Sequence, residues 1–285
     1  MARTIAVDTV SEAAVAAAVA ARASGLAVRE LRDLEHLRLA VDLIGDIWGR
    51  DAGEPVVSLD LVRALSHSGG FVGGAFDGEE LVGATVGFRG AHDGRTSLHS
   101  HVTGVLPRVR SRRVGFALKQ LQRAWSLEHG IGVITWTFDP LVSRNAYFNI
   151  ARLGAFPAAY ERNFYGAMAD DLNRGDESDR LLVAWDLTSP AAVRAATGEP
   201  LIPGDVPLDA TVALRADDEG WPVTAAPEGP VVVCCIPEDI VAIRRRDLSC
   251  ALAWRMALRA TLAEPIRDGY SVAGFARDGR YILEA

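Results

Sequence analysis

The sequence predicts a protein of the α/β class, in which a larger region comes first and a smaller α/β region follows. Strand-like and helix-like segments alternate between residues 26 and 187. Residues 188–230 are rich in Pro, Gly and Ala, and further strand-like and helix-like segments come after them. We therefore expect four parts: an N-terminal helix over 1–25, a main domain over 26–187, an irregular linker with a hairpin over 188–230, and a small α/β unit over 231–285.

Local patterns predict the elements of the first region. Ser11 and Gly25 delimit a surface helix, and the acidic residues ahead of its alanine-rich run argue against a signal peptide. The run "LAVREL" predicts a strand, and two helices follow, the second capped by Ser58. Three more strands are expected at "GFVGGAF", "ELVGATVGF" and "SLHSHVTGVL", with a tight turn at Asp77 and Gly78.

The elements after residue 110 follow from the same kind of pattern. One apolar helix face is marked by Val114, Leu118, Leu121 and Trp125. The run "GVITWTF" predicts a buried strand, "SRNAYFNIARLG" a short helix, and "AAYERNFYG" and "RLLVAWDL" two strands. In the C-terminal region we expect one helix over residues 237–264, stopped by Pro265, with the basic run "RRRD" on its exposed face.

Composition and charge exclude several classes of function. The formal net charge of −7 argues against general nucleic-acid binding, which needs a basic face. The three cysteines form no CxxC pair and predict neither a disulfide framework nor a metal site. No apolar run is long enough to span a bilayer. These observations predict a cytoplasmic protein with no nucleic-acid or membrane partner.

A basic turn before the helix at residue 114 is the best indication of function. Four arginines crowd residues 108–113, and a helix begins at once. The first amides of a helix have no intrahelical acceptor, and the helix dipole adds positive potential there, so this turn predicts a phosphate site. Neither G-x-G-x-x-G nor G-x-x-x-x-G-K-[ST] is present.

The run "VLPRVRSRRVGFAL", with Arg112-x-x-Gly115-x-Ala117 inside it, resembles the pyrophosphate-binding signature of the GNAT superfamily of acyl-CoA N-acyltransferases. The resemblance implies that acetyl-CoA or another acyl-CoA binds as co-substrate, without a metal. The residues implied in binding it are Leu106, Arg110, Arg112, Arg113, Val114, Gly115, Phe116 and Ala117, with Ser143 and Asn145 from "SRNAYFN". Ser111 and Arg113 stand where the family often has glycine, and we expect right-handed helical or extended backbone at both.

The family's order of elements also matches residues 26–187, which implies a GNAT-like mixed, mostly antiparallel sheet flanked by helices. Runs such as "YERNFYG" and "AWRMALR" are similar to a long-form branch with an extra C-terminal α/β region, associated with N-acylation of amino acids. The tyrosine that usually protonates the departing thiolate falls on Ile150. Ile150 cannot donate a proton, so the resemblance leaves the general acid open.

Four residues are candidates for the chemistry. Alternation along "SLHSHVTG" places His99, His101 and Thr103 on one face, where either histidine could be the base or a hydrogen-bonded structural residue. Asp139 could deprotonate or bind an amine, or could serve as a turn residue before Pro140. Tyr165 is our substitute for the missing acid, with a structural role as the alternative.

These residues predict an enzyme that moves an acetyl, succinyl or similar acyl group from CoA to the amine of a small molecule, such as an amino acid, in a ternary complex. The alternative is a non-catalytic acyl-CoA-binding domain that acts as a sensor or partner module. The C-terminal region is expected either to cover the acceptor pocket or to form a homodimer contact, and the sequence leaves both open.

Overall fold

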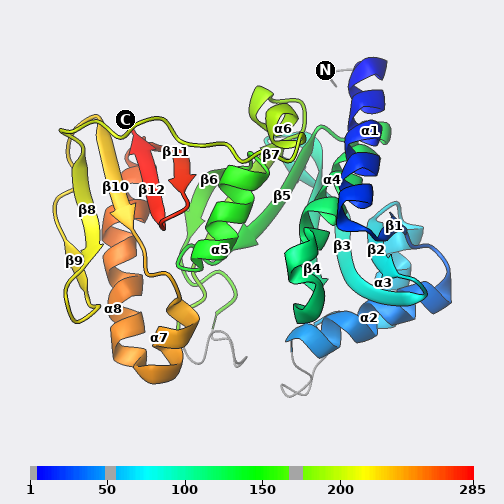
Figure 1. Ribbon diagram of the computed structural model, residues 1–285, viewed down its shortest axis with the longest axis horizontal. Helices are drawn as coiled ribbons and strands as arrows, with labels where there is room; N and C mark the ends of the chain where they lie inside the picture. The colour runs from blue at the N-terminus through cyan, green and yellow to red at the C-terminus, as the bar shows by residue number, and fades with distance from the viewer. Residues whose placement is uncertain (1–4, 49–55, 167–175) are drawn as a thin grey trace. The chain divides into compact units, whose positions relative to one another are not determined.

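The computed structural model describes residues 5–48, 56–166 and 176–285 (Figure 1). The chain forms two compact units, each built from two stretches of sequence. The first contains Met1–Trp136 and Trp185–Gly198, and the second contains Thr137–Ala184 and Glu199–Ala285. These limits differ from the four parts expected, because the N-terminal helix belongs to the first unit and the division falls inside strands β5 (Val133–Phe138) and β7 (Arg180–Asp186).

The first unit is built on a mixed sheet in the order β1-β2-β3-β4-β5. The strands before β5 are β1 (Ala27–Glu30), β2 (Phe71–Asp77), β3 (Glu80–His92) and β4 (Arg95–Val105). They pair antiparallel in sequence order, whereas β5 pairs parallel with β4. The expected turn between β2 and β3 is present, with Gly78 at a φ of 63°.

Helices cover both faces of this sheet. Those of the first unit are α1 (Val7–Ser24), α2 (Leu34–Trp48), α3 (Leu59–His67), α4 (Val114–Glu128) and α6 (Pro190–Ala195), with a 3₁₀ helix, η1 (Pro107–Arg112), before α4. The neighbouring residues Gly83 and Ala84 show the two faces. A Cβ at Gly83 would meet Val114, whereas Ala84 packs in the core under α2 and α3. Helix α1 packs on α4 and ends at Ser24 with Gly25 as its C-cap, as expected, but it begins at Val7 and not after Ser11 (Figure 1).

The first unit therefore shows the predicted α/β fold class. A strand is followed by two helices, three antiparallel strands, the helix after the arginine turn and a fifth strand. This is the order that the resemblance implies. Within residues 5–48, 56–166 and 176–285, no helix has the length and apolar character that a membrane crossing needs.

The second unit contains an antiparallel pair and a separate five-stranded sheet. Strand β6 (Phe156–Glu161) pairs with β7 and follows α5 (Ser143–Ala146) and a π-helix, η2 (Tyr147–Arg152). The five-stranded sheet has the order β11-β12-β10-β8-β9. Its strands are β8 (Thr211–Ala216), β9 (Pro222–Thr224), β10 (Val231–Cys235), β11 (Ser271–Ala276) and β12 (Arg280–Glu284). Strands β8 and β9 form the hairpin expected within residues 188–230, so this sheet begins before residue 231.

The helix expected over residues 237–264 is divided into several pieces. They are α7 (Ile240–Arg246), α8 (Leu248–Leu258), a π-helix, η3 (Arg259–Ala263), and α9 (Glu264–Arg267). Asp247 separates α7 from α8, because its carboxylate accepts a hydrogen bond from the Cys250 amide and caps the second helix. Pro265 does not stop the helix, because α9 continues directly from the π-helix η3 with Pro265 in its first turn.

Four buried charged side chains join elements of the second unit. Arg244 of α7 donates to Asp139 at 2.6 Å and to Asp176 at 2.7 Å. Arg255 of α8 contacts the same two carboxylates at 2.9 and 2.8 Å. All four residues are buried. The expectation that the "RRRD" run is an exposed face therefore fails at Arg244, which points into this cluster.

The cluster predicts a large loss of stability when one charge is removed. Arg255→Met should lower the free energy of unfolding by about 3–5 kcal/mol, because it leaves two buried carboxylates facing one arginine. Chemical denaturation followed by circular dichroism measures this. Arg267→Met, at an exposed arginine beside Asp268, is the matched control and should cost at most about 1 kcal/mol. Equal losses in the two variants would contradict the assignment.

Candidate active site

The arginine turn lies between β4 and α4, as predicted, but its backbone differs from the expectation at one residue. Arg113 has φ 59° and ψ 27°, in the left-handed region, where right-handed or extended backbone was expected. The chain needs this conformation to pass from the last residue of η1 into α4. Glycine adopts it without steric cost, which is a physical reason for glycine at this position of the GNAT pattern.

Two of the four arginines hold the first unit together. Arg112 donates from Nη1 to Asp77 at 2.6 Å, from Nε to the Ser24 carbonyl at 3.1 Å and from Nη2 to the Gly25 carbonyl at 3.0 Å. It therefore fixes the C-terminal end of α1, and the structure corrects its expected role as a phosphate ligand. Arg108 forms an ion pair with Glu80.

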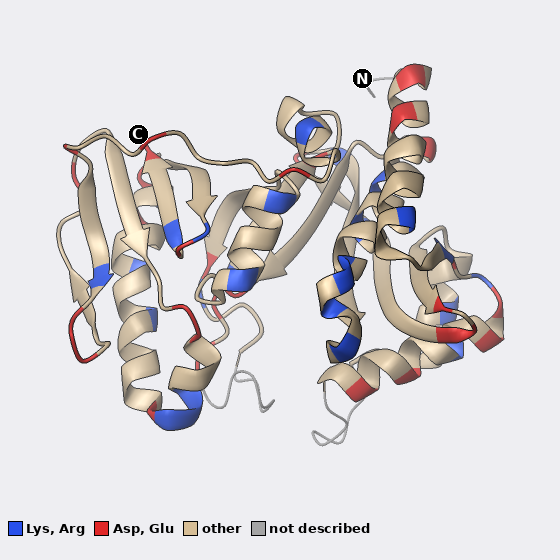
Figure 2. Cartoon of the chain, in the orientation of Figure 1, with Lys and Arg blue, Asp and Glu red and all other residues tan. Residues whose placement is uncertain are grey.

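The other two arginines remain available for an anion. Arg110 and Arg113 are exposed, and no hydrogen bond or ion pair to another described residue engages either guanidinium. The amides of Val114 and Gly115 lie in the first turn of α4, where a helix offers no intrahelical acceptor. The Ala117 amide donates to the Arg113 carbonyl at 3.1 Å, which removes it from the expected set. Figure 2 shows the Lys and Arg residues that gather along the segment from η1 into α4.

Strand β4 carries a β-bulge next to the two candidate histidines. Ser100 is opposite Gly87 and Val102 is opposite Val86, so His101 is the extra residue. The bulge reverses the alternation of side chains beyond it. Thr103 consequently lies on the same face as its partner Thr85, with 2.8 Å between the two hydroxyl oxygens. The sequence had placed Thr103 on the face of His99, and this expectation was wrong.

His99 and His101 lie close together beside Phe88, with 6.5 Å between their ring centroids. Burial lowers the pKa of His99 to about 4, with smaller contributions from His101 and Lys119. Burial also lowers the pKa of His101. Both rings are therefore neutral near pH 7 and could accept a proton. The Nδ1 atom of His99 lies 3.1 Å from the Thr135 hydroxyl, whereas His101 is exposed.

Among the described residues, strand β4 pairs with β5 along only part of its length. Its pairing with β5 covers Leu98 and His99, although β4 continues to Val105. Past that strand, the Leu106 amide donates to the Val82 carbonyl at 3.0 Å. The Leu106 amide is therefore occupied and is not available to a ligand.

Sequence reasoning missed a buried lysine under this strand. Lys119 of α4 donates to the Ser100 hydroxyl at 2.8 Å and to Gln122 at 3.2 Å, and its Nζ lies 3.9 Å from the centre of the Trp136 ring. Burial lowers the pKa of Lys119 to about 7. The sequence did hold a signal for it, because Lys119, Gln120 and Gln122 stand among the apolar residues of this helix. Among the described residues, buried side-chain atoms without a hydrogen-bond partner lie on Gln120, Gln122, Trp125 and Ser126 of α4 and on Trp185.

The remaining predicted residues belong to the second unit. Asp139 is the residue whose role changes most. Burial disfavours its ionised form, but Arg255 and Arg244 hold the pKa of its carboxyl well below the usual range. This environment makes Asp139 an ion-pair partner in place of the base that the sequence suggested. Ser143 and Asn145 lie on α5, and Phe116, from the expected CoA set, is buried in the first unit.

Tyr165 lies in the turn after β6, where a strand was expected. Its side chain is exposed, and its hydroxyl lies 3.0 Å from that of Thr137. Ile150, at the family's usual tyrosine position, is buried in η2. Among the described residues, no group of three or more metal-ligating side chains is present.

No protein-family model and no curated protein sequence matches this chain. Several solved structures are similar to part of it. A probable acetyltransferase from Staphylococcus epidermidis is 18% identical with a TM-score of 0.47, over 57% of this chain and 99% of its own. A GNAT-family acetyltransferase from Streptococcus pneumoniae is 11% identical with a TM-score of 0.45, over 56% of this chain and 98% of its own.

A third similar structure is FeeM, an N-acyl amino acid synthase from uncultured soil microbes. It is 13% identical with a TM-score of 0.43, over 57% of this chain and 91% of its own. At these identities and TM-scores the similarities carry nothing about activity, which has to be argued from the residues of this chain.

The left-handed backbone of Arg113 predicts that glycine stabilises the turn. Arg113→Gly should raise the free energy of unfolding by about 1 kcal/mol, because glycine has no Cβ to strain at a φ of 59°. Urea denaturation measures this. Arg110→Gly, in the right-handed 3₁₀ turn, should lower stability instead, and a loss in both variants would contradict the conformational argument.

Burial of His99 predicts a pH-dependent stability. The folded pKa of about 4 lies below the ordinary value of 6.5, so the unfolded chain binds the proton more tightly. Stability should therefore fall as the pH drops from 6.5 to 4, by on the order of 2 kcal/mol from this residue. His99→Gln should remove that slope in denaturation curves taken across the range. His67→Gln, at an exposed histidine, should leave it unchanged.

Proposed function

We propose that this protein is an acyl-CoA N-acyltransferase of the GNAT superfamily. It transfers an acetyl, succinyl or similar acyl group from CoA to the amine of a small molecule, with an amino acid as the candidate acceptor. The observation that carries the proposal is the arginine turn at the start of α4, directly after a strand that leaves part of its edge unpaired. In this proposal CoA is a co-substrate and no metal takes part.

The pyrophosphate is assigned to the start of α4. Arg110 and Arg113 supply unpaired positive charge, and the first-turn amides of Val114 and Gly115 supply hydrogen-bond donors. Gly115 has no side chain to stand between those amides and a ligand. This set differs from the one drawn from the sequence, because Arg112, Leu106 and Ala117 have other partners.

The pantetheine arm is assigned to the unpaired edge of β4. Pantetheine carries two amide groups, which can pair with an exposed strand edge as a further strand would. In this arrangement the arm runs from the start of α4 along the strand, and the thioester comes toward the bulge at His101. Backbone amides there are the proposed donors to the oxyanion.

The reaction needs one base and one acid. The ammonium of the acceptor first loses a proton, and its nitrogen then attacks the thioester carbonyl carbon. The carbon–sulfur bond breaks, and the CoA thiolate takes a proton. We assign His101 as the base, because its exposed ring is neutral near pH 7, with His99 beside it as the alternative. Tyr165, whose side chain is exposed in the second unit, stays the acid that the sequence proposes.

One observation favours a second candidate, a domain that binds acyl-CoA without turning it over. Ile150 is 1% exposed and packed in an apolar environment, so no proton donor occupies the position where the family has its tyrosine. Catalysis then depends wholly on a substitute acid.

Calorimetric titration with CoA tests the binding site. Arg110→Gln should weaken CoA binding about tenfold or more, because it removes a charge-assisted contact to phosphate. Arg108→Gln is the matched control from the same turn, and should have little effect because Arg108 is paired with Glu80. Equal affinity in wild type and Arg110→Gln, or binding of ATP and NADH in place of CoA, would overturn the assignment.

An assay of free CoA thiol with acetyl-CoA or succinyl-CoA and a panel of amino acids then separates the two candidates. Amine-dependent release supports the enzyme, and His101→Gln should lower its rate. CoA binding without release from any donor and acceptor pair supports the binding domain.

A further inference from the structure

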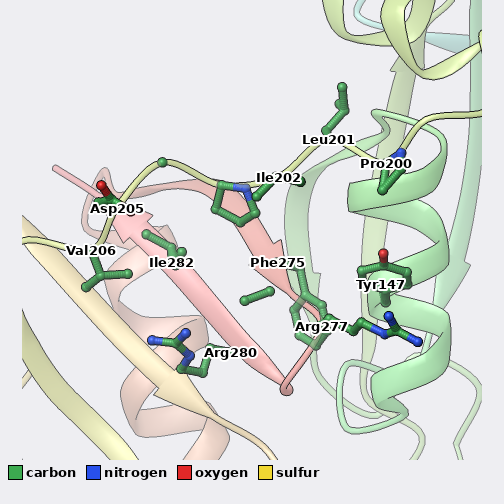
Figure 3. Close-up of a pocket in the computed structure, with 13 residues that line it drawn as sticks. Tyr147, Pro200, Leu201, Ile202, Asp205, Val206, Phe275, Arg277, Arg280 and Ile282 are labelled. Atoms are coloured by element: carbon green, nitrogen blue, oxygen red, sulfur yellow. The ribbon is translucent and has the colours of Figure 1, made fainter.

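A pocket lies within the second unit and uses none of the residues assigned to acyl-CoA. Its volume is about 670 Å³, in the range of natural small-molecule sites. The segment 200–206 forms one wall, and strands β11 and β12 with Tyr147 of η2 form the others (Figure 3).

The wall formed by segment 200–206 is fixed to the rest of the unit at two points. The Leu201 amide donates to the Ala151 carbonyl of η2 at 2.7 Å. Pro203 lies against β11 so closely that a Cβ on Gly274 would come within 3.1 Å of its ring atoms. The pocket is therefore built from segments that touch, although they are far apart in sequence.

Most of the lining is apolar. Phe275 and Ile282 come from the two strands and are themselves buried, whereas Ile202 and Val206 of the opposite wall have accessible apolar surface. Ile202 is 84% exposed, which is unusual for a large aliphatic side chain and leaves apolar surface facing water beside the pocket. A ligand with an apolar body would cover this surface.

The charge of the pocket is concentrated at one end. Arg280 is neutralised locally, because its Nε donates to both carboxylate oxygens of Asp278 at 2.9 Å. Arg277 has no hydrogen bond or ion pair with another described residue, and its guanidinium extends toward Tyr147 (Figure 3). The acidic lining residue, Asp205, lies at the opposite end of the pocket in the same view (Figure 3).

We propose that this pocket binds a small organic carboxylate with an apolar body. The two carboxylate oxygens match the paired N–H groups of the Arg277 guanidinium, and the Tyr147 hydroxyl can donate a further hydrogen bond. The apolar body lies on Ile202 and Val206. One unpaired arginine suits a singly charged carboxylate better than a phosphate ester, which carries more charge and needs more donors.

Calorimetric titration of the full chain with 4-phenylbutyrate, hexanoate and indole-3-acetate tests the proposal. Saturable binding with a Kd of about 1 mM or tighter is expected for at least one of them. Two further probes separate the contributions. Acetate has the carboxylate without the apolar body, and 4-phenylbutanol has the body without the carboxylate, so both should bind at least about tenfold more weakly.

Arg277→Gln should weaken binding of the best carboxylate about tenfold, whereas Arg267→Gln, at an exposed arginine outside the pocket, should leave it unchanged. Gly274→Ala places a methyl group against Pro203 and should also weaken binding by displacing that wall. No saturable binding of the three carboxylates, equal binding of 4-phenylbutanol, or full affinity in Arg277→Gln would each overturn the proposal. CoA titrations of the same variants should be unchanged, so failure here is distinct from failure of the acyltransferase assignment.

Discussion

The ion pairs among Asp139, Asp176, Arg244 and Arg255 are the interaction on which the second unit depends. Transfer of four charges out of water costs far more than a surface ion pair returns, so the arrangement is tolerable only because each carboxylate meets both arginines. The contacts fix the chain after β5, the chain before β7 and the two helices α7 and α8 relative to one another. They also make Asp139 unsuited to act as a catalytic base, because two arginines lower the pKa of its carboxyl.

In the first unit, α4 connects the proposed phosphate site to the proposed reaction centre. Its first turn presents amides and arginines, and its middle is buried between α1 and the sheet. Lys119 extends from that buried part to Ser100, one residue before the bulge that carries His101. The histidines and the buried lysine thus lie in one region of the first unit. A positive charge near the histidines favours their neutral form, which is the form that a proton acceptor needs.

Features that depend on neighbouring residues could be predicted from the sequence. Gly25 ends its helix, Asp77 and Gly78 form a hairpin turn, and the arginine turn precedes a helix. Features set by distant contacts could not. The sequence predicts Arg112 as a phosphate ligand, whereas in the fold its guanidinium donates to Ser24 and Asp77. Asp139 meets arginines that lie 105 and 116 residues later. The extra residue at His101 follows from pairing with β3, and no pattern within β4 reveals it.

Each compact unit combines two separate stretches of chain, and the five-stranded sheet belongs to a unit that begins at Thr137. The C-terminal region is therefore not a separate domain, because it forms one compact unit with Thr137–Ala184. A chain cut after Leu187 would keep Asp139 and Asp176 but lose both arginines that neutralise them. The elements before and after residue 187 therefore depend on one another to neutralise these buried charges.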